Sequence, residues 1–218
     1  MMKRLIVCVF IFAATIVSSY AQKPSATAAP NKGPKYEDVV AKLRAGDTKV
    51  DYRMLRIAYS ASKDASPYGS DRTARAVMNK AISEKRYKDA IKSAEEILKT
   101  DYVNPFAHMA KAVAHRELGE TDKYEFHKAV YLGLLNSILA SGEGKTFDTA
   151  YVVISTEEEY AVMQALGFAV VGQSLQRDKD HTFDVLHGTD SKTGNKIDVY
   201  FNIDIVWAME NRMFNPKS

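Results

Sequence analysis

The sequence has one cysteine, little glycine or proline, and no apolar run long enough for an ordinary membrane span. The single cysteine, Cys8, lies in the first apolar segment, so neither a disulfide nor thiol chemistry is expected in a processed chain. Eleven glycines and six prolines among 218 residues, with 46% hydrophobic residues, exclude collagen-like and disordered classes. The 30 basic and 27 acidic residues are too evenly balanced for a protein that binds nucleic acid through net charge. One globular domain, or two small ones, remains.

Residues 1–21 have the pattern of an export signal. Two basic residues, Lys3 and Arg4, precede a short apolar run, and small residues at Ser19 and Ala21 suit cleavage by a signal peptidase. The run is shorter than the roughly 20 residues that an ordinary membrane span needs, so the mature chain is expected to have no transmembrane segment. The sequence therefore predicts an exported protein that is periplasmic or secreted after removal of the signal.

The first half of the mature chain has helical periodicity. Residues 22–35 are rich in proline, alanine and small polar residues and are interpreted as a flexible leader. Over residues 36–140 apolar positions recur with helical spacing, and Ala90, Ala112 and Gly119 fit the small-residue positions of a 34-residue tetratricopeptide repeat. We expect a tetratricopeptide-like helical region whose two repeats are capped by neighbouring structure.

Beyond about residue 145 the pattern changes from helical to alternating. Residues 145–214 are expected to form a small, mainly antiparallel sheet with one or two helices. The expected strands cover residues 150–154, 168–175, 181–187 and 196–204, with a turn at 190–195. Together with the helical region, this pattern predicts the α+β fold class.

The inner face of the predicted repeats offers a candidate binding surface. Its residues combine arginines with an apolar strip and are Arg72, Arg75, Asn79, Phe106, Met109 and Arg116. Arginine beside apolar side chains is suited to acidic peptides or terminal carboxylates. The alternative is that the sheet region covers this strip, because two repeats alone leave an apolar face to be capped.

A second candidate site lies on the predicted sheet. Alternation in the last strand places Asp198 and Asp204 on one face, and pairing across the hairpin is expected to bring Asp184 near Asn202 on that face. Three carboxylates there would suit calcium or magnesium and a divalent-metal-dependent hydrolase. An ordinary solvated sheet face gives the same alternation.

Two further clusters of ionisable residues have structural explanations. The three glutamates at 157–159 follow Ser155 and Thr156, which indicates helix capping and a favourable helix dipole. The histidines His108, His115 and His127 lie at inward positions of the predicted repeats and lack the usual spacing of a zinc site. No G-x-S-x-G motif is present, so the sequence gives no argument for a Ser/His/Asp triad.

Several segments, in order along the chain, together resemble a family of exported bacterial proteins known as domain of unknown function 4919. These segments are residues 50–59 (VDYRMLRIAY), 66–69 (SPYG), 133–144 (GLLNSILASGEG), 149–155 (TAYVVIS), 159–160 (EY) and 200–204 (YFNID). The resemblance covers most of the chain from about residue 36 to 214. It implies an exported protein with a helical half and an α+β tail, and it supplies no activity, cofactor or catalytic residue.

These observations predict a non-catalytic protein or peptide interaction module of the cell envelope. The expected partner is a protein or peptide, not nucleic acid, and no cofactor is expected. The alternative function is the metal-dependent hydrolase that would use Asp184, Asp198 and Asp204.

Overall fold

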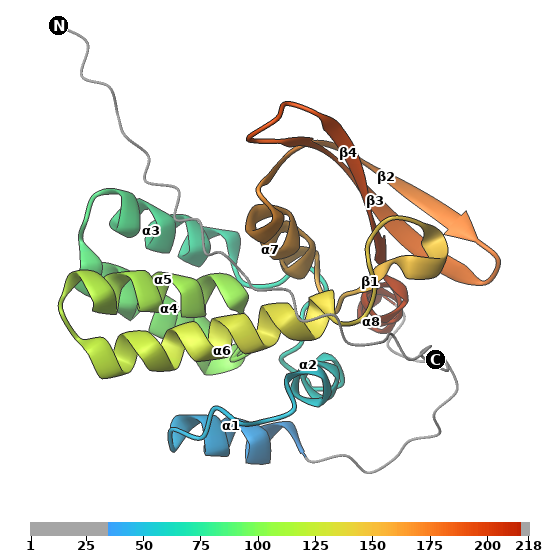
Figure 1. Ribbon diagram of the computed structural model, residues 1–218. Helices are drawn as coiled ribbons and strands as arrows, with labels where there is room; N and C mark the ends of the chain where they lie inside the picture. Colours follow the sequence, from blue (N-terminus) through green and yellow to red (C-terminus); the bar gives the residue numbers. More distant parts are fainter. Residues whose placement is uncertain (1–34, 215–218) are drawn as a thin grey trace, which may run out of the picture.

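The computed structural model describes residues 35–214 (Figure 1), so the predicted signal and nearly all of the predicted leader lie outside the described residues. Helices come first along the chain and a four-stranded sheet follows, which confirms the α+β class. Within residues 35–214, no helix combines the length and apolar character needed to cross a membrane.

The helical half contains six α-helices. Their bounds are α1 (Tyr36–Arg44), α2 (Tyr52–Ser60), α3 (Arg72–Ser83), α4 (Tyr87–Thr100), α5 (Pro105–Glu117) and α6 (Thr121–Leu139). Helices α3 to α6 pack against their neighbours in sequence, and α3 also contacts α5. Ala90 and Ala112 are buried, and Gly119 has a φ of +73° in the turn before α6, as a close-packed helix pair needs.

Polar caps explain where several of these helices begin. Asp71 accepts hydrogen bonds from the backbone N–H groups of Thr73 and Ala74, and Asn104 accepts one from Ala107 with Pro105 in the first turn. Such caps satisfy backbone donors that a helix start leaves unpaired. Helices α3 and α5 therefore begin directly after residues whose side chains cap them.

The sheet half alternates strands with two helices. The elements are a short 3₁₀ turn η1 (Phe147–Thr149), β1 (Tyr151–Val152), α7 (Thr156–Leu166), β2 (Phe168–Asp178), β3 (His181–Asp190), β4 (Lys196–Asn202) and α8 (Asp204–Phe214). The strand order is β1-β4-β3-β2. β1 runs parallel to β4 and the other pairs are antiparallel, so the sheet is mixed.

The described residues have two apolar cores, and helix α6 contributes to both. Helix α6 contributes Val130 and Leu134 to a core among the helices, and Leu135 and Ile138 to a second core under the sheet. Helix α7 lies between the helices and the sheet (Figure 1) and contacts α5, α6 and β2. The sheet half therefore packs against the helical half through α6 and α7.

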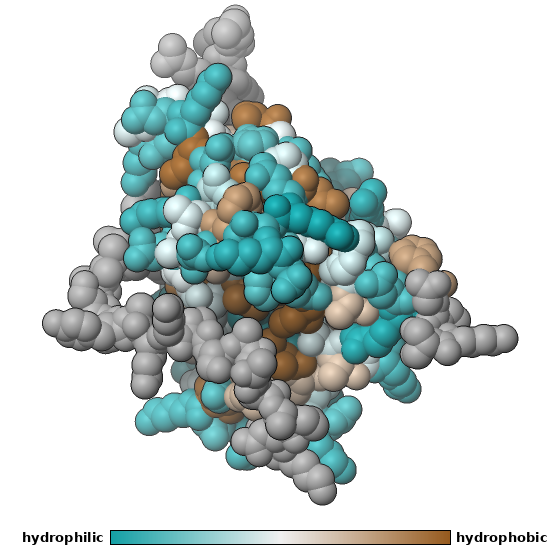
Figure 2. All heavy atoms as spheres, turned by 90° about the vertical axis from the view of Figure 1, so that its right-hand side faces the viewer, coloured by the Kyte–Doolittle hydropathy of each residue, from teal (hydrophilic) through white to brown (hydrophobic). Residues whose placement is uncertain are grey.

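Strand β2 forms one edge of the sheet and has no fully buried residue. Two of its apolar side chains, Val171 and Leu175, are 70% and 59% exposed. Seen from the side on which the sheet lies, apolar side chains are scattered among hydrophilic ones (Figure 2). This edge strand is therefore open to solvent among the described residues.

The register of the sheet corrects one expectation. Asn202 pairs with Phe183, and Asp184 pairs with Phe201, one residue away from the predicted pairing. Phe201 is fully buried, so Asp184 lies on the inner face of the sheet. A shift of one residue exchanges the two faces of a strand, and the predicted grouping of Asp184 with Asp198 is therefore wrong. Asp204 begins α8 instead of ending the last strand.

Candidate functional site

The first turn of α7 has three consecutive glutamates, Glu157, Glu158 and Glu159, and all three are buried. Ser155 occupies the N-cap position, but its side chain makes no capping bond, whereas Glu158 accepts a hydrogen bond from the backbone N–H of Ile154 at 2.9 Å. The predicted cap by the serine side chain is therefore wrong. Consecutive helix residues point in directions about 100° apart, and each glutamate consequently meets a different part of the molecule.

Glu158 is held by a buried arginine from α2. Both carboxylate oxygens accept hydrogen bonds from Arg56, from Nε and Nη2, at 2.6 Å, and the side chains are 2% and 3% exposed. Arg56 also donates to the Val152 carbonyl at 2.9 Å and to Ser137 Oγ at 3.3 Å. The buried positive charge of Arg56 is compensated by the carboxylate of Glu158. Through this pair and its two further hydrogen bonds, Arg56 connects α2 with α6, β1 and α7.

Glu157 turns toward α3 and α5. It accepts hydrogen bonds from the backbone N–H and the hydroxyl of Ser70, from Arg75 at 2.9 Å, and from the Asn104 side chain at 2.5 Å. A Cβ at Gly69 would lie 2.4 Å from the Glu157 side chain, so only glycine allows this carboxylate to approach the turn. Glu157 therefore fixes the start of α3 against α7.

Glu159 faces the sheet and lies against Asp184 of β3. Burial, then the charge of Asp184, raises the pKa of Glu159 well above its ordinary value, and burial also raises the pKa of Asp184. Glu159 Oε1 and Asp184 Oδ1 have no hydrogen-bond partner among the described residues. Two adjacent buried carboxyl groups cannot both ionise cheaply, so the pair retains a proton.

Asp101 is a further buried carboxyl group beside this junction. Its Oδ2 accepts a hydrogen bond from Asn104, while its Oδ1 has no partner among the described residues. Burial is the main cause that raises the pKa of Asp101 to about 7, with smaller contributions from Glu157 and Glu158. Asp101 therefore binds a proton at pH values where an exposed aspartate is ionised.

The predicted arginine surface is partly occupied by α7. Arg75 binds the carboxylate of Glu157, and its guanidinium also lies 5.8 Å from the centre of the Phe106 ring. Met109 contacts the Gln164 side chain of α7 at 3.6 Å. The carboxylate that the sequence analysis assigns to a partner is thus supplied, at Arg75, by the chain itself.

The remaining residues of that predicted surface lie apart from this contact. Arg72 and Asn79 are exposed on α3, and Arg116 at the end of α5 pairs with Glu117 at 2.8 Å. The strip is neither a continuous open groove nor fully buried, because Phe106 and Met109 keep intermediate exposure.

The three histidines of the helical half form a buried stack. His108 Nε2 donates to the Tyr102 carbonyl at 2.9 Å, because a carbonyl can only accept. His108 Nδ1 lies 3.0 Å from His127 Nδ1, and the His127 ring stacks on His115 with an angle of 9° between their planes. All three rings are buried, so the interpretation as core histidines is confirmed.

Burial keeps two of these imidazoles neutral. Desolvation lowers the pKa of His108 to about 4, and desolvation followed by the charges of His108 and Lys111 lowers the pKa of His127 to about 2. With His108 neutral, its Nδ1 carries no proton and accepts the bond from His127 Nδ1–H.

The predicted metal ligands do not lie together. Asp184 faces α7, whereas Asp198 lies on the opposite face of the sheet and pairs with His187 at 2.8 Å. Asp204 accepts hydrogen bonds from His181 Nδ1 at 2.6 Å and from the Thr182 backbone N–H at 2.8 Å. Among residues 35–214, no three histidine, cysteine, aspartate or glutamate side chains are grouped so that they could hold a metal ion.

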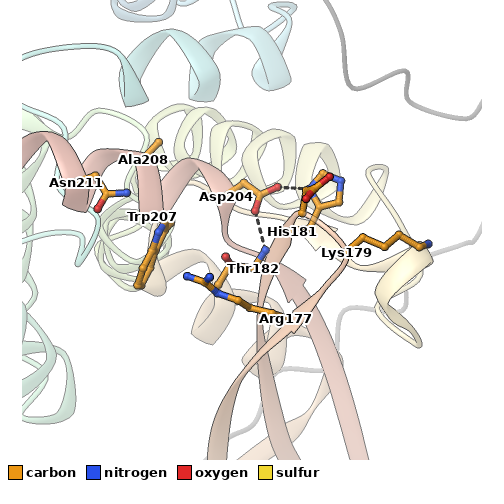
Figure 3. A pocket seen from close by; sticks show the side chains of 9 residues that line it. Arg177, Lys179, His181, Thr182, Asp204, Trp207, Ala208 and Asn211 are labelled. Atoms are coloured by element: carbon orange, nitrogen blue, oxygen red, sulfur yellow. Dashed lines mark hydrogen bonds and ion pairs between the residues drawn. The ribbon is translucent and has the colours of Figure 1, made fainter. Parts of the chain in front are cut away.

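A pocket of about 450 Å³ opens between the β2–β3 turn and the first turns of α8 (Figure 3). Its lining consists of Arg177, Lys179, Asp180, His181, Thr182, Asp204, Trp207, Ala208 and Asn211. This volume falls within the range of small-molecule sites. The pocket therefore combines charged, amide and aromatic side chains from β2, β3 and α8.

Arg177 is the cation in this pocket that has no acidic partner. Its guanidinium lies 5.6 Å from the centre of the Trp207 ring, and the two side chains lie side by side in Figure 3. Among the described residues no carboxylate pairs with Arg177, whereas Lys179 lies 3.6 Å from Asp148 and Asp204 is bound by His181. A cation–π contact at this distance attracts the guanidinium to the indole and leaves its N–H donors available to a ligand.

The sequence analysis did not identify this pocket. Arg177 and Trp207 are 30 residues apart, and neither belongs to a motif with known spacing. The one usable signal in the sequence is that Trp207 is the only tryptophan of the chain.

Comparison with known families gives one match. The model of a family described as Domain of unknown function (DUF4919) matches residues 31–212. No curated protein and no solved structure matches the chain. The family match spans both the helical half and the sheet half, including α7 and the pocket beside α8. The chain therefore belongs to the DUF4919 family.

Proposed function

We propose that this protein is exported and acts as a protein or peptide interaction module of the cell envelope, with the pocket beside α8 as its binding site. The observation that carries the proposal is Arg177, a guanidinium fixed on Trp207 without an acidic partner among the described residues. Arginine in such a setting binds carboxylates through two parallel hydrogen bonds.

The ligand group that fits this pocket best is a carboxylate on a peptide. Asp204 adds little repulsion, because His181, the Thr182 N–H and the Asn202 side chain all donate to it. The Asn211 side chain, at the opposite side of the pocket in Figure 3, offers an amide for a peptide group. An extended chain with a free terminal carboxylate presents both kinds of group.

The proposed ligand group is still a carboxylate bound by arginine, but the arginine is Arg177 of the pocket instead of Arg75 of the helical surface. Arg75 already binds Glu157, so a partner would have to displace a buried carboxylate there. Arg177 requires no such exchange. Arg72, Asn79 and Arg116 remain a predicted secondary surface on the helical half.

The binding proposal is tested by the fluorescence of Trp207. We expect acetylated random pentapeptides with a free C-terminal carboxylate to change the emission of Trp207. The same peptides with a C-terminal amide should bind at least about tenfold more weakly, because the amide carries no charge. Arg177→Gln should remove this preference, while the matched variant Arg53→Gln, at an exposed position of α2, should keep it. Equal binding of acid and amide peptides, or unchanged binding by Arg177→Gln, would refute the proposal.

Export is tested separately by expressing the full chain with its first 21 residues. The mature protein should begin at Gln22 by mass spectrometry and should be absent from the cytoplasmic fraction. A chain that keeps Lys3 and Arg4 and stays in the cytoplasm would contradict the export part of the proposal.

A further inference from the structure

Three polar residues line up across the sheet on the face turned away from α7. Ser174 lies on β2, His187 on β3 and Asp198 on β4. His187 pairs directly with Asp198 in the ladder, and its Nδ1 lies 2.8 Å from the Asp198 carboxylate. Its other ring nitrogen, Nε2, lies 3.2 Å from Ser174 Oγ. These are the contacts of a nucleophile, a base and a residue that orients the base.

The hydrogen-bond directions in this line are mutually consistent. A carboxylate only accepts, so His187 donates from Nδ1 to Asp198. In the neutral ring Nε2 then carries a lone pair, which accepts the hydroxyl proton of Ser174. The Gln176 amide donates to Ser174 Oγ at 3.0 Å, which leaves the hydroxyl proton free to point at the histidine.

A β-bulge places Ser174 on this face. Up to Val170, β2 pairs with β3 in one register, and from Gly172 onward the register shifts by one residue. If the register before the bulge continued along the strand, Ser174 would pair with Asp184 and point to the inner face, away from His187. Bulges of this kind redirect side chains and are frequent next to active sites.

The imidazole of His187 reaches across to Ser174 on the neighbouring strand. His187 lies directly opposite Gly172, and a Cβ at Gly172 would make only an ordinary contact with it, 3.7 Å from His187 Cδ2. The ring contacts Ser174 diagonally, two residues further along β2. Diagonal neighbours on adjacent strands are within reach of long side chains.

The line is accessible to a substrate. The side chains of His187 and Asp198 are 39% and 54% exposed, and Ser174 has intermediate exposure. Gln176 supplies a side-chain amide beside Ser174 Oγ, and amides of this type stabilise the negative oxygen of a tetrahedral intermediate.

We propose that Ser174 and His187 hydrolyse carboxylic esters, with Asp198 as the positioning residue. Ser174 Oγ forms a bond to the ester carbonyl carbon and its proton passes to His187 Nε2. His187 returns that proton to the leaving alcohol oxygen as the ester C–O bond breaks. Water then attacks the acyl group on Ser174, again through His187, and releases the acid and the free serine. Water is the only co-reactant of these steps, and they are independent of carboxylate binding at Arg177.

The first experiment uses the whole protein with a fluorophosphonate probe and with p-nitrophenyl acetate. The probe should modify Ser174, as located by peptide mass spectrometry, and the Ser174→Ala variant should lose at least about 100-fold in ester turnover. The matched control is Ser191→Ala, which removes an exposed serine in the β3–β4 turn and should keep full turnover. Because Ser174→Ala retains His187, it also measures ester cleavage by the imidazole alone.

The positioning role of Asp198 is tested by kinetics. Asp198→Asn should lower kcat at least about tenfold with little change in KM, because an amide that donates to Nδ1 places the ring proton on Nε2. Asp198→Glu should recover part of kcat. Turnover that is unchanged in Ser174→Ala, probe that does not modify Ser174, or a kcat that Asp198→Asn leaves intact would each overturn the proposal.

Discussion

The histidine stack of the helical half and the carboxyl groups around α7 are both buried, yet they respond to burial in opposite ways. His108 and His127 lose their protons, because desolvation lowers the pKa of a base. Asp101 and Glu159 keep theirs, because desolvation raises the pKa of an acid. Only Glu157 and Glu158 have an arginine partner in this region.

The two clusters also connect different parts of the fold. The histidines join α5 to α6, two helices that are already neighbours in sequence. The glutamates join α7 to α2, to α3 and to β3, which lie far apart in sequence. The carboxyl cluster therefore fixes the sheet half on the helical half, and removing its partners should have the larger consequence.

The largest expected effect comes from Arg56. Arg56→Ala would leave Glu158 buried without its cation, and the free energy of unfolding should fall by about 3–5 kcal/mol. Chemical denaturation measures this loss. The double variant Arg56→Met with Glu158→Leu should recover most of it, since it removes both charges.

The matched control for this prediction is Arg86→Ala. Arg86 pairs with Glu84 and Asp89 at an exposed position, so the unfolding midpoint should stay unchanged. If Arg56→Ala were as mild as Arg86→Ala, the buried pair would not join the two halves.

The next largest effect concerns the histidines. His127 has a pKa of about 2 in the folded chain and about 6.5 when unfolded, so the unfolded state binds more protons below pH 6.5. Stability is therefore lost as the pH falls from 6.5 toward 4. His127→Phe should reduce this slope by about 1.4 kcal/mol per pH unit, measured by denaturation at several pH values. An unchanged slope would mean that His127 is charged in the folded protein.

Asp101 should show an effect of similar size and opposite sign. Its folded pKa of about 7 exceeds the unfolded value near 3.8, so the folded state binds more protons and stability falls as the pH rises from 4 to 7. Relative to the native chain, Asp101→Asn should gain about 4 kcal/mol between pH 4 and pH 8. A difference that does not vary with pH would show that Asp101 is ionised throughout.

The smallest expected effect is at Arg72. This residue is exposed on α3 and takes no part in either cluster, so Arg72→Ala should leave the thermal midpoint and its pH dependence unchanged. A clear change in the thermal midpoint of Arg72→Ala would show that stability also depends on charges outside the histidine and carboxyl clusters.

Local signals in the sequence identified many elements correctly. Asp71 and Asn104 cap helices because capping depends on a few adjacent residues, and the alternation of Val199 and Phe201 identified the buried face of β4. Gly119 likewise marked a turn that its positive φ requires. These features depend on chemistry within a few positions of the chain.

The candidate sites depended on long-range geometry that the sequence does not contain. A register difference of one residue placed Asp184 on the inner face, and one bulge before Gly172 brought Ser174 to His187. The direction of Glu157 toward Arg75 required the packing of α7 against α3 and α5. The pattern of residues in a strand does not determine its exact pairing with the next strand. A shift of one position changes every cross-strand neighbour.

The central claim is that the glutamates of α7 bind the two halves into one cooperative unit. The most direct test is urea unfolding measured with two probes on the same samples. Far-ultraviolet circular dichroism reports mainly the helices, and Trp207 fluorescence reports α8. The account predicts coincident transitions for the native chain, both moved to lower urea by Arg56→Ala. Two separate midpoints in the native chain would contradict it.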